Sequence, residues 1–340
     1  MKLKHIFKGV AFFAVLALIA YAVFQMDLSQ IMGNIMGADP AAVLGSGLSI
    51  LTMILLWHLI WDLALRSIKK VSYLRTLPVM WTGILFNTLT PSANFGGEPL
   101  RAYYMKKLYG GKKSRYLASI LFQKILNYVG LISTFLVSLL LVSLHSASTF
   151  GESVRWISAF TLGILAAIVL LFAVSHAFRP WIFRLISKFY SFFKHDRAAF
   201  QQYLHASYSR FYSALKNLMR TPSLLFLSFL ISVTARLMFI LASYLAFLAI
   251  GHNVPFRVVF LVVSIGAFAA DIPIVPGGIG VTEGTLVLVY TLAGIPAPVA
   301  TAGVLLMRLL YYIIALGGGF LSWVHLSSHY GKRPGTDPSI

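Results

Sequence analysis

Apolar runs of about twenty residues recur from one end of the chain to the other, separated by short polar stretches. An α-helix needs about 20 apolar residues to cross ~30 Å of hydrocarbon. The strands of a membrane β-barrel alternate with period two over about ten residues, and these continuous runs disfavour a barrel. Charged residues make up 11% of the 340 residues, against roughly 25% in soluble proteins. The sequence therefore predicts an all-α polytopic membrane protein.

Six of the apolar runs are long enough to be full transmembrane helices. They are expected at about 6–25, 41–65, 116–144, 156–178, 222–250 and 297–326. The first run has the basic start of a signal peptide, but it is long and no small-x-small cleavage site follows it. We therefore interpret it as an uncleaved first span.

Lysine and arginine are concentrated on one set of connections. This set holds 23 of the 28 Lys and Arg residues and comprises 1–8, 66–75, 101–115, 179–221 and 327–340. Basic connections stay in the cytoplasm, so both termini are expected there, in the inner membrane of a prokaryotic cell. The net charge of +19 could also suggest nucleic-acid binding. Cytoplasmic loops near anionic headgroups explain it better.

Two apolar segments are interrupted rather than continuous. Residues 77–90 stop at "TPSANFGGEP", and residues 256–275 stop at "DIPIVPGGIG" before a short apolar piece at 283–294. Basic residues flank the first segment on both sides, so 77–98 is expected to enter and leave from the cytoplasm as a re-entrant hairpin. The second segment, 256–294, starts after an outside loop, so it should enter from the opposite face.

The two breaks share a pattern. Each has a proline, a glycine pair and a glutamate seven residues after the proline, which run from Pro91 to Glu98 and from Pro276 to Glu283. Interrupted segments at corresponding places in two halves are typical of an inverted repeat. We expect one domain over 1–326, with halves at about 1–145 and 156–326.

The segment 179–221 interleaves aromatic and basic residues, and 327–340 is expected to be a short cytoplasmic tail. Some RNA-binding surfaces have a composition like that of 179–221. We favour amphipathic helices lying in the cytoplasmic interface of the membrane. Within the last expected span, the glycines of "LGGGF", Leu316 to Phe320, are expected to allow close helix packing.

Non-helical backbone at membrane depth survives only where it is buried in protein or faces a wet cavity. The two breaks therefore predict a cavity, although packed structural kinks are the alternative. Helices are expected to begin near Glu98 and, capped by Thr282, at 283–294. Their N-termini would face the cavity and favour an anion such as phosphate.

Charged residues within the membrane are rare and usually functional. Glu98 and Arg101, three residues apart, can pair on one helix face, either as a structural salt bridge or as ligand-binding groups. Glu283 needs a partner from another helix, for which Arg236 and Arg308 are the candidates. Asp271 could pair with an arginine or carry a proton.

Other polar groups receive simpler interpretations. Asn87 is expected to satisfy backbone groups at the turn, and Lys124 to extend its ammonium group toward the cytoplasmic surface. His58 and Asp62 stand four apart but lack a third ligand nearby, so a packing hydrogen bond is favoured over a metal. No metal or other cofactor is expected. The chain has no cysteine for a thiolate metal site, and it has no P-loop motif, so ATP-driven transport is not expected.

Both breaks together resemble the lysylphosphatidylglycerol synthase transmembrane family, the flippase-like domain. The stretches "NTLTPSANFGGEPLRAYYM" and "PIVPGGIGVTEGTLVL" carry the resemblance, together with an arginine in the following span. The family residues that match are Asn87, Pro91, Gly96, Gly97, Glu98, Arg101, Pro276, Gly277, Gly278, Gly280, Glu283 and Arg308. The resemblance implies a polytopic domain that moves lipids between leaflets.

Multidomain relatives also carry a cytosolic aminoacyltransferase, which the fourteen residues after the last expected span cannot form. The sequence thus favours a stand-alone, non-enzymatic transporter of an anionic phospholipid or a polyprenyl-phosphate-linked lipid. Assembly as a homo-oligomer is compatible with this interpretation. An intramembrane enzyme acting on lipid phosphates and a non-transporting scaffold are the alternatives. The candidate substrate-binding residues are Asn87, Asn94, Gly96, Gly97, Glu98, Arg101, Arg236, Asp271, Gly277, Gly278, Gly280, Thr282, Glu283, Arg308 and Tyr311.

Overall fold

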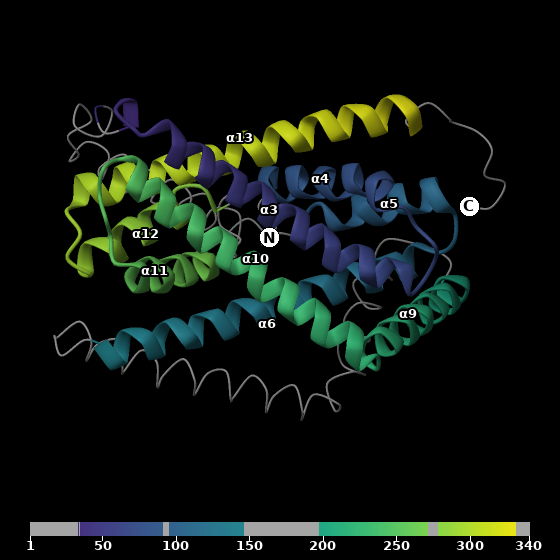
Figure 1. Ribbon diagram of the computed structural model, residues 1–340. Helices are drawn as coiled ribbons and strands as arrows, with labels where there is room; N and C mark the ends of the chain where they lie inside the picture. Colours follow the sequence, from purple (N-terminus) through teal and green to yellow (C-terminus); the bar gives the residue numbers. More distant parts are fainter. Residues whose placement is uncertain (1–32, 34, 91–94, 146–196, 271–277, 331–340) are drawn as a thin grey trace, which may run out of the picture.

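The computed structural model describes residues 33, 35–90, 95–145, 197–270 and 278–330 (Figure 1). Every regular element in these residues is an α-helix, which confirms the all-α prediction. The expected spans at 6–25 and 156–178 lie outside the described residues, as do 179–196 and most of the expected tail.

The helices, in chain order, are α3 (Pro40–Arg66), α4 (Tyr73–Leu89), α5 (Glu98–Tyr109), α6 (Lys113–His145), α9 (Arg197–Met219), α10 (Pro222–Ala249), α11 (Phe256–Ala269), α12 (Val281–Leu292) and α13 (Ala297–Tyr330).

Four of these helices, α3, α6, α10 and α13, are long and apolar enough to cross a membrane. They match the predicted spans at 41–65, 116–144, 222–250 and 297–326, and α13 continues four residues further, to Tyr330. The chain is therefore an integral, multi-pass membrane protein.

Helices α3 and α10 pack along each other in opposite directions (Figure 1). At one end the hydroxyl of Ser46 donates to the carbonyl of Ala242 at 2.8 Å. At the other end Ile60 and Leu224 share one apolar cluster. The start of α3 thus lies at the end of α10, and this antiparallel pair forms the centre of the molecule.

Helices α4 and α5 form an antiparallel hairpin. At its open end the N–H of Ser72 donates to the hydroxyl of Tyr109 at 3.2 Å. At its closed end the backbone of Gly97 lies directly against that of Gly83, with no room for a Cβ atom. The helices on either side of the break predicted at "PSANFGGEP" therefore form a hairpin, and α5 begins at Glu98 as expected.

Helices α11 and α12 form a second hairpin. Gly266 in the last turn of α11 contacts Leu286 of α12, and Gly278 contacts the backbone of Ala270. Figure 1 shows this hairpin toward one end of the long helices and the α4–α5 hairpin toward the other. Both predicted hairpins thus exist as helix pairs.

Each hairpin packs on the last long helix of the other half: α4 lies against α13, and α11 lies against α6. The close approach of α4 and α13 depends on "LGGGF", where Gly318 faces the ring of Trp81 and Gly319 faces Leu85. This confirms the predicted packing role for Gly318 and Gly319 but not for Gly317, where an added Cβ atom would meet nothing within 4 Å. The crossed packing brings the two hairpins around one central space.

Helix α9 covers the described part of the predicted segment 179–221 and packs against α6. Its buried Leu218 joins a cluster with Ile60 and Phe122. A position of this helix in the membrane interface stays a prediction.

Candidate functional site

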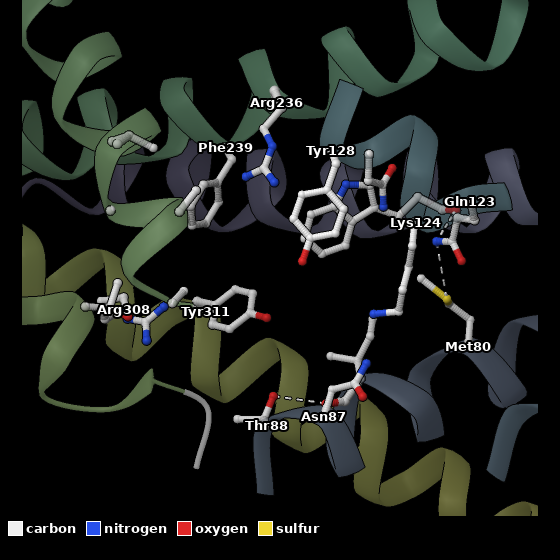
Figure 2. Close-up of a pocket in the computed structure, with 18 of the residues that line it drawn as sticks. Met80, Asn87, Thr88, Gln123, Lys124, Tyr128, Arg236, Phe239, Arg308 and Tyr311 are labelled. Carbon is white, nitrogen blue, oxygen red and sulfur yellow. Dashed lines mark hydrogen bonds between the residues drawn. The ribbon is translucent and has the colours of Figure 1, made fainter. Parts of the chain in front are cut away.

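A cavity of about 170 Å³ lies between the two hairpins. All four helices of the two hairpins contribute to it, together with the long helices α3, α6, α10 and α13. Figure 2 shows Asn87 and Thr88, Lys124 and Tyr128, Arg236, and Tyr311 around a common space. The cavity expected from the breaks is therefore present.

Glu98, at the start of α5, has two cationic partners. Its Oε2 accepts from Arg101 at 3.0 Å, and its Oε1 lies 2.9 Å from the ammonium of Lys124. Arg101 is 3% exposed and also donates to the amide oxygen of Gln123 at 2.6 Å. Its guanidinium lies 4.0 Å from the ring centroid of Trp61. The predicted Glu98–Arg101 pair is thus confirmed, with further partners.

Asn87 closes the tip of the first hairpin. Its Oδ1 accepts from the N–H of Gly97 at 2.7 Å, and its Nδ2 donates to Glu98 at 3.1 Å. The amide therefore satisfies a backbone donor at the first turn of α5, as predicted, and also orients the carboxylate.

The expectation for Lys124 was wrong. Its ammonium does not extend to the surface but pairs with Glu98, and its side chain is 13% exposed. It also lies 4.3 Å from the ring centroid of Phe95. A carboxylate at this depth attracts a cation strongly because little water screens the pair, so the ion pair prevails over hydration at the surface.

Glu283, in the first turn of α12, has the arginine partner that it required. Its Oε1 accepts from Arg308 at 2.5 Å and from the hydroxyl of Tyr312 at 3.1 Å. Its Oε2 accepts from the N–H of Gly280 at 2.6 Å. Arg308 also donates to Tyr312. Of the two candidate partners, the structure therefore selects Arg308 and not Arg236.

Thr282 is not the cap that we expected. Helix α12 begins at Val281, and Gly280 caps it with φ of +83°, a conformation that glycine adopts readily. Because Thr282 therefore lies in the first turn of the helix, its hydroxyl is not at the cap position. Thr282 lines the cavity instead, 3% exposed, and its hydroxyl has no hydrogen-bond partner among the described residues.

The remaining predicted site residues fall into three groups. Arg236 and Tyr311 line the cavity, and Tyr311 lies near Thr88 across the α4–α13 contact. Gly96, Gly97, Gly278 and Gly280 lie in the turns that precede α5 and α12. Asn94, Asp271 and Gly277 lie outside the described residues.

His58 and Asp62 point to different partners. His58 bonds the carbonyl of Tyr73 at 2.9 Å, and Asp62 pairs with Arg66 at 2.7 Å. Across the described ranges, no group of three His, Cys, Asp or Glu residues could hold a metal. The packing interpretation of His58 is therefore confirmed.

Cationic side chains outnumber carboxylates around the cavity. Its described lining contains Arg101, Lys124, Arg236 and Arg308 but one carboxylate, Glu98. Counting Glu283, which pairs with Arg308, the described residues here hold four cations and two carboxylates, a net charge of +2. A recess lined by one sign of charge attracts ligands of the opposite sign, so this cavity is suited to an anion.

Sequence reasoning missed several lining residues, namely Trp57, Gln123, Lys124, Asn127 and Tyr128. One signal was available: Lys124 is followed four residues later by Tyr128, as Arg308 is by Tyr312. Each basic residue also follows a hairpin glutamate, Glu98 or Glu283, at almost the same sequence distance. That correspondence identifies Lys124 as the partner of Glu98.

Known proteins similar to this chain share nearly its whole length. A UPF0104 membrane protein of Methanothermobacter thermautotrophicus is 26% identical, covering 93% of this chain and 94% of its own length. UPF0104 membrane proteins of Pyrococcus horikoshii and Methanocaldococcus jannaschii are 26% and 24% identical and cover 84% and 96% of this chain. They cover 88% and 96% of their own lengths.

The family model described as the lysylphosphatidylglycerol synthase TM region matches residues 6–319. This match takes in both hairpins, the cavity between them and the long helices around it. The chain therefore belongs to the family of the lysylphosphatidylglycerol synthase transmembrane region.

Proposed function

We propose that this protein moves an anionic, phosphate-bearing lipid between the leaflets of the cytoplasmic membrane, and that it does so without chemically changing the lipid. The headgroup occupies the cavity between the two hairpins while the hydrocarbon chains stay in the apolar surroundings. The net positive charge of the described residues around the cavity is the observation that carries the proposal.

Unsatisfied polar atoms in the cavity support a polar occupant. Arg101 Nε and Asn127 Oδ1 are buried without a hydrogen-bond partner among the described residues, and so is Thr282 Oγ1. Buried polar groups are normally paired. A phosphate group can accept from Arg101 and Thr282, and water or a headgroup hydroxyl can donate to Asn127.

The arrangement of the helices supports alternating access. Helix α3, the α4–α5 hairpin and α6 recur as α10, the α11–α12 hairpin and α13. Because α3 and α10 run in opposite directions, we propose that these halves are an inverted repeat, with hairpins that enter from opposite faces. The basic connections and both termini would be cytoplasmic. Assembly as a homo-oligomer stays a prediction.

The family description supports a lipid substrate, since it names a region of an enzyme of lipid synthesis. The described residues around the cavity carry a net positive charge, so we do not propose the cationic lysylphosphatidylglycerol as the substrate. A phosphate whose charge is not offset by an aminoacyl group suits the cavity better.

A reconstitution assay tests the proposal. Liposomes containing the purified protein and a fluorescent anionic phospholipid are treated with a membrane-impermeant quencher. Transport predicts that fluorescence of the inner leaflet is also lost. Lys124→Gln, which removes one cavity charge, should slow this at least about tenfold, the effect of losing one charge-assisted hydrogen bond of about 1.5–3 kcal/mol. Lys112→Gln, at an exposed loop position, is the matched control.

Equal rates in protein-containing and protein-free liposomes, across anionic lipid classes, would refute transport and favour a scaffold. A change in the mass of the lipid would instead favour an intramembrane enzyme. If Lys124→Gln and Lys112→Gln slowed transport equally, transport would not depend on the charge in the cavity, contrary to the proposal.

A further inference from the structure

The cavity is lined by corresponding positions of the two halves. Trp57 and Phe239 stand at the same position of α3 and α10, counted from Pro40 and Pro222. On α4 and α11, counted from Tyr73 and Phe256, three lining pairs correspond in the same way. These pairs are Met80 and Val263, Ile84 and Ala267, and Asn87 and Ala270. The cavity therefore lies where the two halves face each other.

Local packing confirms the correspondence. Gly83 and Gly266 occupy the same position of α4 and α11, and each lacks a Cβ atom where a side chain of the returning helix passes. That side chain is Arg101 at Gly83 and Leu286 at Gly266, and each stands three residues after the hairpin glutamate. Arg101 and Leu286 are thus structural counterparts.

Some corresponding positions differ in polarity. Arg236 of α10, which lines the cavity, corresponds to the apolar Ile54 of α3. Three cavity positions are polar in the first half and apolar in the second. They are Asn87 and Ala270, Arg101 and Leu286, and Gln123 and Met307. The polar members belong to the hydrogen-bonded cluster around Glu98. Among the described lining residues, Thr282 is the one polar side chain from the α11–α12 hairpin.

We propose that the cavity binds an amphiphilic phosphate ester in a fixed orientation. The phosphate lies against the polar wall, formed by Arg101, Gln123 and Lys124. The hydrocarbon that follows the phosphate lies against the apolar wall, formed by Ala267, Ala270 and Leu286. This inference rests on the proposed function, since it assumes that a lipid enters the cavity, and it adds which wall of the cavity holds each end of the ligand.

Both walls line the same cavity of about 170 Å³. A ligand that contacts both walls must therefore carry its polar group and its hydrocarbon directly next to each other. Inorganic phosphate satisfies only the polar wall and an alkanol only the apolar one. A compound with both parts gains from both contacts, and each buried methylene adds roughly fourfold in affinity, from about 0.8 kcal/mol.

Calorimetric titration of the purified full chain with octyl phosphate, inorganic phosphate and 1-octanol tests this inference. Octyl phosphate should bind at least about tenfold more tightly than either of the others. Leu286→Gln should weaken octyl phosphate severalfold and leave inorganic phosphate unchanged. Gln123→Met, which places a residue like its counterpart Met307 in the polar wall, should weaken both phosphates.

Leu288→Gln is the matched control, since Leu288 is on the same helix but 59% exposed, and it should leave binding unchanged. Ala270→Asn, at a partly exposed position, repeats the test should Leu286→Gln not fold. Equal affinity for octyl phosphate and inorganic phosphate would overturn the proposal. So would equal weakening of both phosphates by Leu286→Gln and Ala270→Asn.

These titrations do not measure movement between leaflets. Oriented binding without transport would contradict the proposed function and support this inference. If the protein transports lipid but substitutions in the apolar wall leave binding unchanged, the proposed function would be supported and this inference contradicted.

Discussion

The two hairpin glutamates have unequal partners. Glu98 contacts two cations, Arg101 and Lys124, whereas Glu283 contacts one, Arg308. The first cluster therefore carries an excess positive charge and the second is neutral. We therefore propose that an arriving anion is attracted to the Glu98 cluster and that the Glu283 cluster has a mainly structural role.

Breaking the second cluster should destabilise the protein. Arg308→Met leaves the carboxylate of Glu283, 14% exposed, without its cation, which should cost about 3–5 kcal/mol of unfolding free energy. The double variant Arg308→Met with Glu283→Gln removes both charges and should recover at least half of that loss. Denaturant titration of the detergent-solubilised variants measures these free energies.

The single variant Glu283→Gln completes a double-mutant cycle. Additive effects of the two substitutions would show that Arg308 and Glu283 do not interact, contrary to the structure. An exposed pair of the same chemistry would be worth at most about 1 kcal/mol, so the size of the coupling also reports burial.

Residue spacing predicted contacts within one helix better than contacts between helices. Glu98 and Arg101 were paired correctly because positions three apart share a helix face. Glu283 was given two candidate arginines, and only the packing of α12 on α13 decides between them. Lys124 was misassigned because its partner is on another helix, and only a comparison with Arg308 and Tyr312 in the second half indicates that contact.

At the scale of elements, each hairpin depends on a glycine that lets its two helices touch. Gly83 in α4 is contacted by both Gly97 and Arg101 of the first hairpin, and Gly266 in α11 by Leu286 of the second. Such small residues bring membrane helices into close contact. The tight contact fixes where the glutamate at the start of the returning helix lies.

Adding one methyl group at Gly83 should disturb the first hairpin. Arg101 cannot move aside, because Glu98, Gln123 and Trp61 hold it. Gly83→Ala should therefore lower the melting temperature, with a loss of about 1–3 kcal/mol from overpacking. Thermal unfolding followed by circular dichroism measures the change.

Gly317→Ala is the control for this substitution. Gly317 is in α13, and a methyl group added there would meet open space, so helix propensity alone favours alanine by about 0.5–1 kcal/mol. A Gly83→Ala protein as stable as Gly317→Ala would contradict the close packing of α4 on α5.

The existence of the elements followed from the sequence, but some of their ends did not. Proline and glycine clusters predicted both breaks, because such residues interrupt a helix. The cap of α12 was placed two residues too late at Thr282, since the positive φ of Gly280 is set by the tip of the hairpin. Local propensity cannot report such a conformation.

At the scale of the molecule, the same order of helices occurs twice around the antiparallel pair α3 and α10. The repeated Pro, Gly-Gly and Glu pattern was enough to predict this order. It could not predict that some corresponding positions line the cavity with unlike side chains. That difference emerges only when corresponding positions such as Arg101 and Leu286 are found to face one space.

Opposite entry of the hairpins can be tested by labelling, because the chain has no cysteine. Lys112→Cys, at the open end of the first hairpin, should react with an impermeant maleimide only from the cytoplasmic side. Asn253→Cys, which precedes α11, should react only from the opposite side. Labelling of intact and of permeabilised cells distinguishes the two sides, and labelling of both positions from one side would contradict an inverted arrangement.

The account depends most on one claim, that lipid crosses the membrane through the cavity between the hairpins. Ala267 of α11 lines this cavity, so Ala267→Trp fills it without changing its charge. Leu288→Trp places the same ring on an exposed position of α12. The measurement is the rate of anionic lipid exchange between leaflets in liposomes containing either folded variant. We predict that Ala267→Trp abolishes exchange and that Leu288→Trp preserves it, whereas undiminished exchange through the filled cavity would contradict the account.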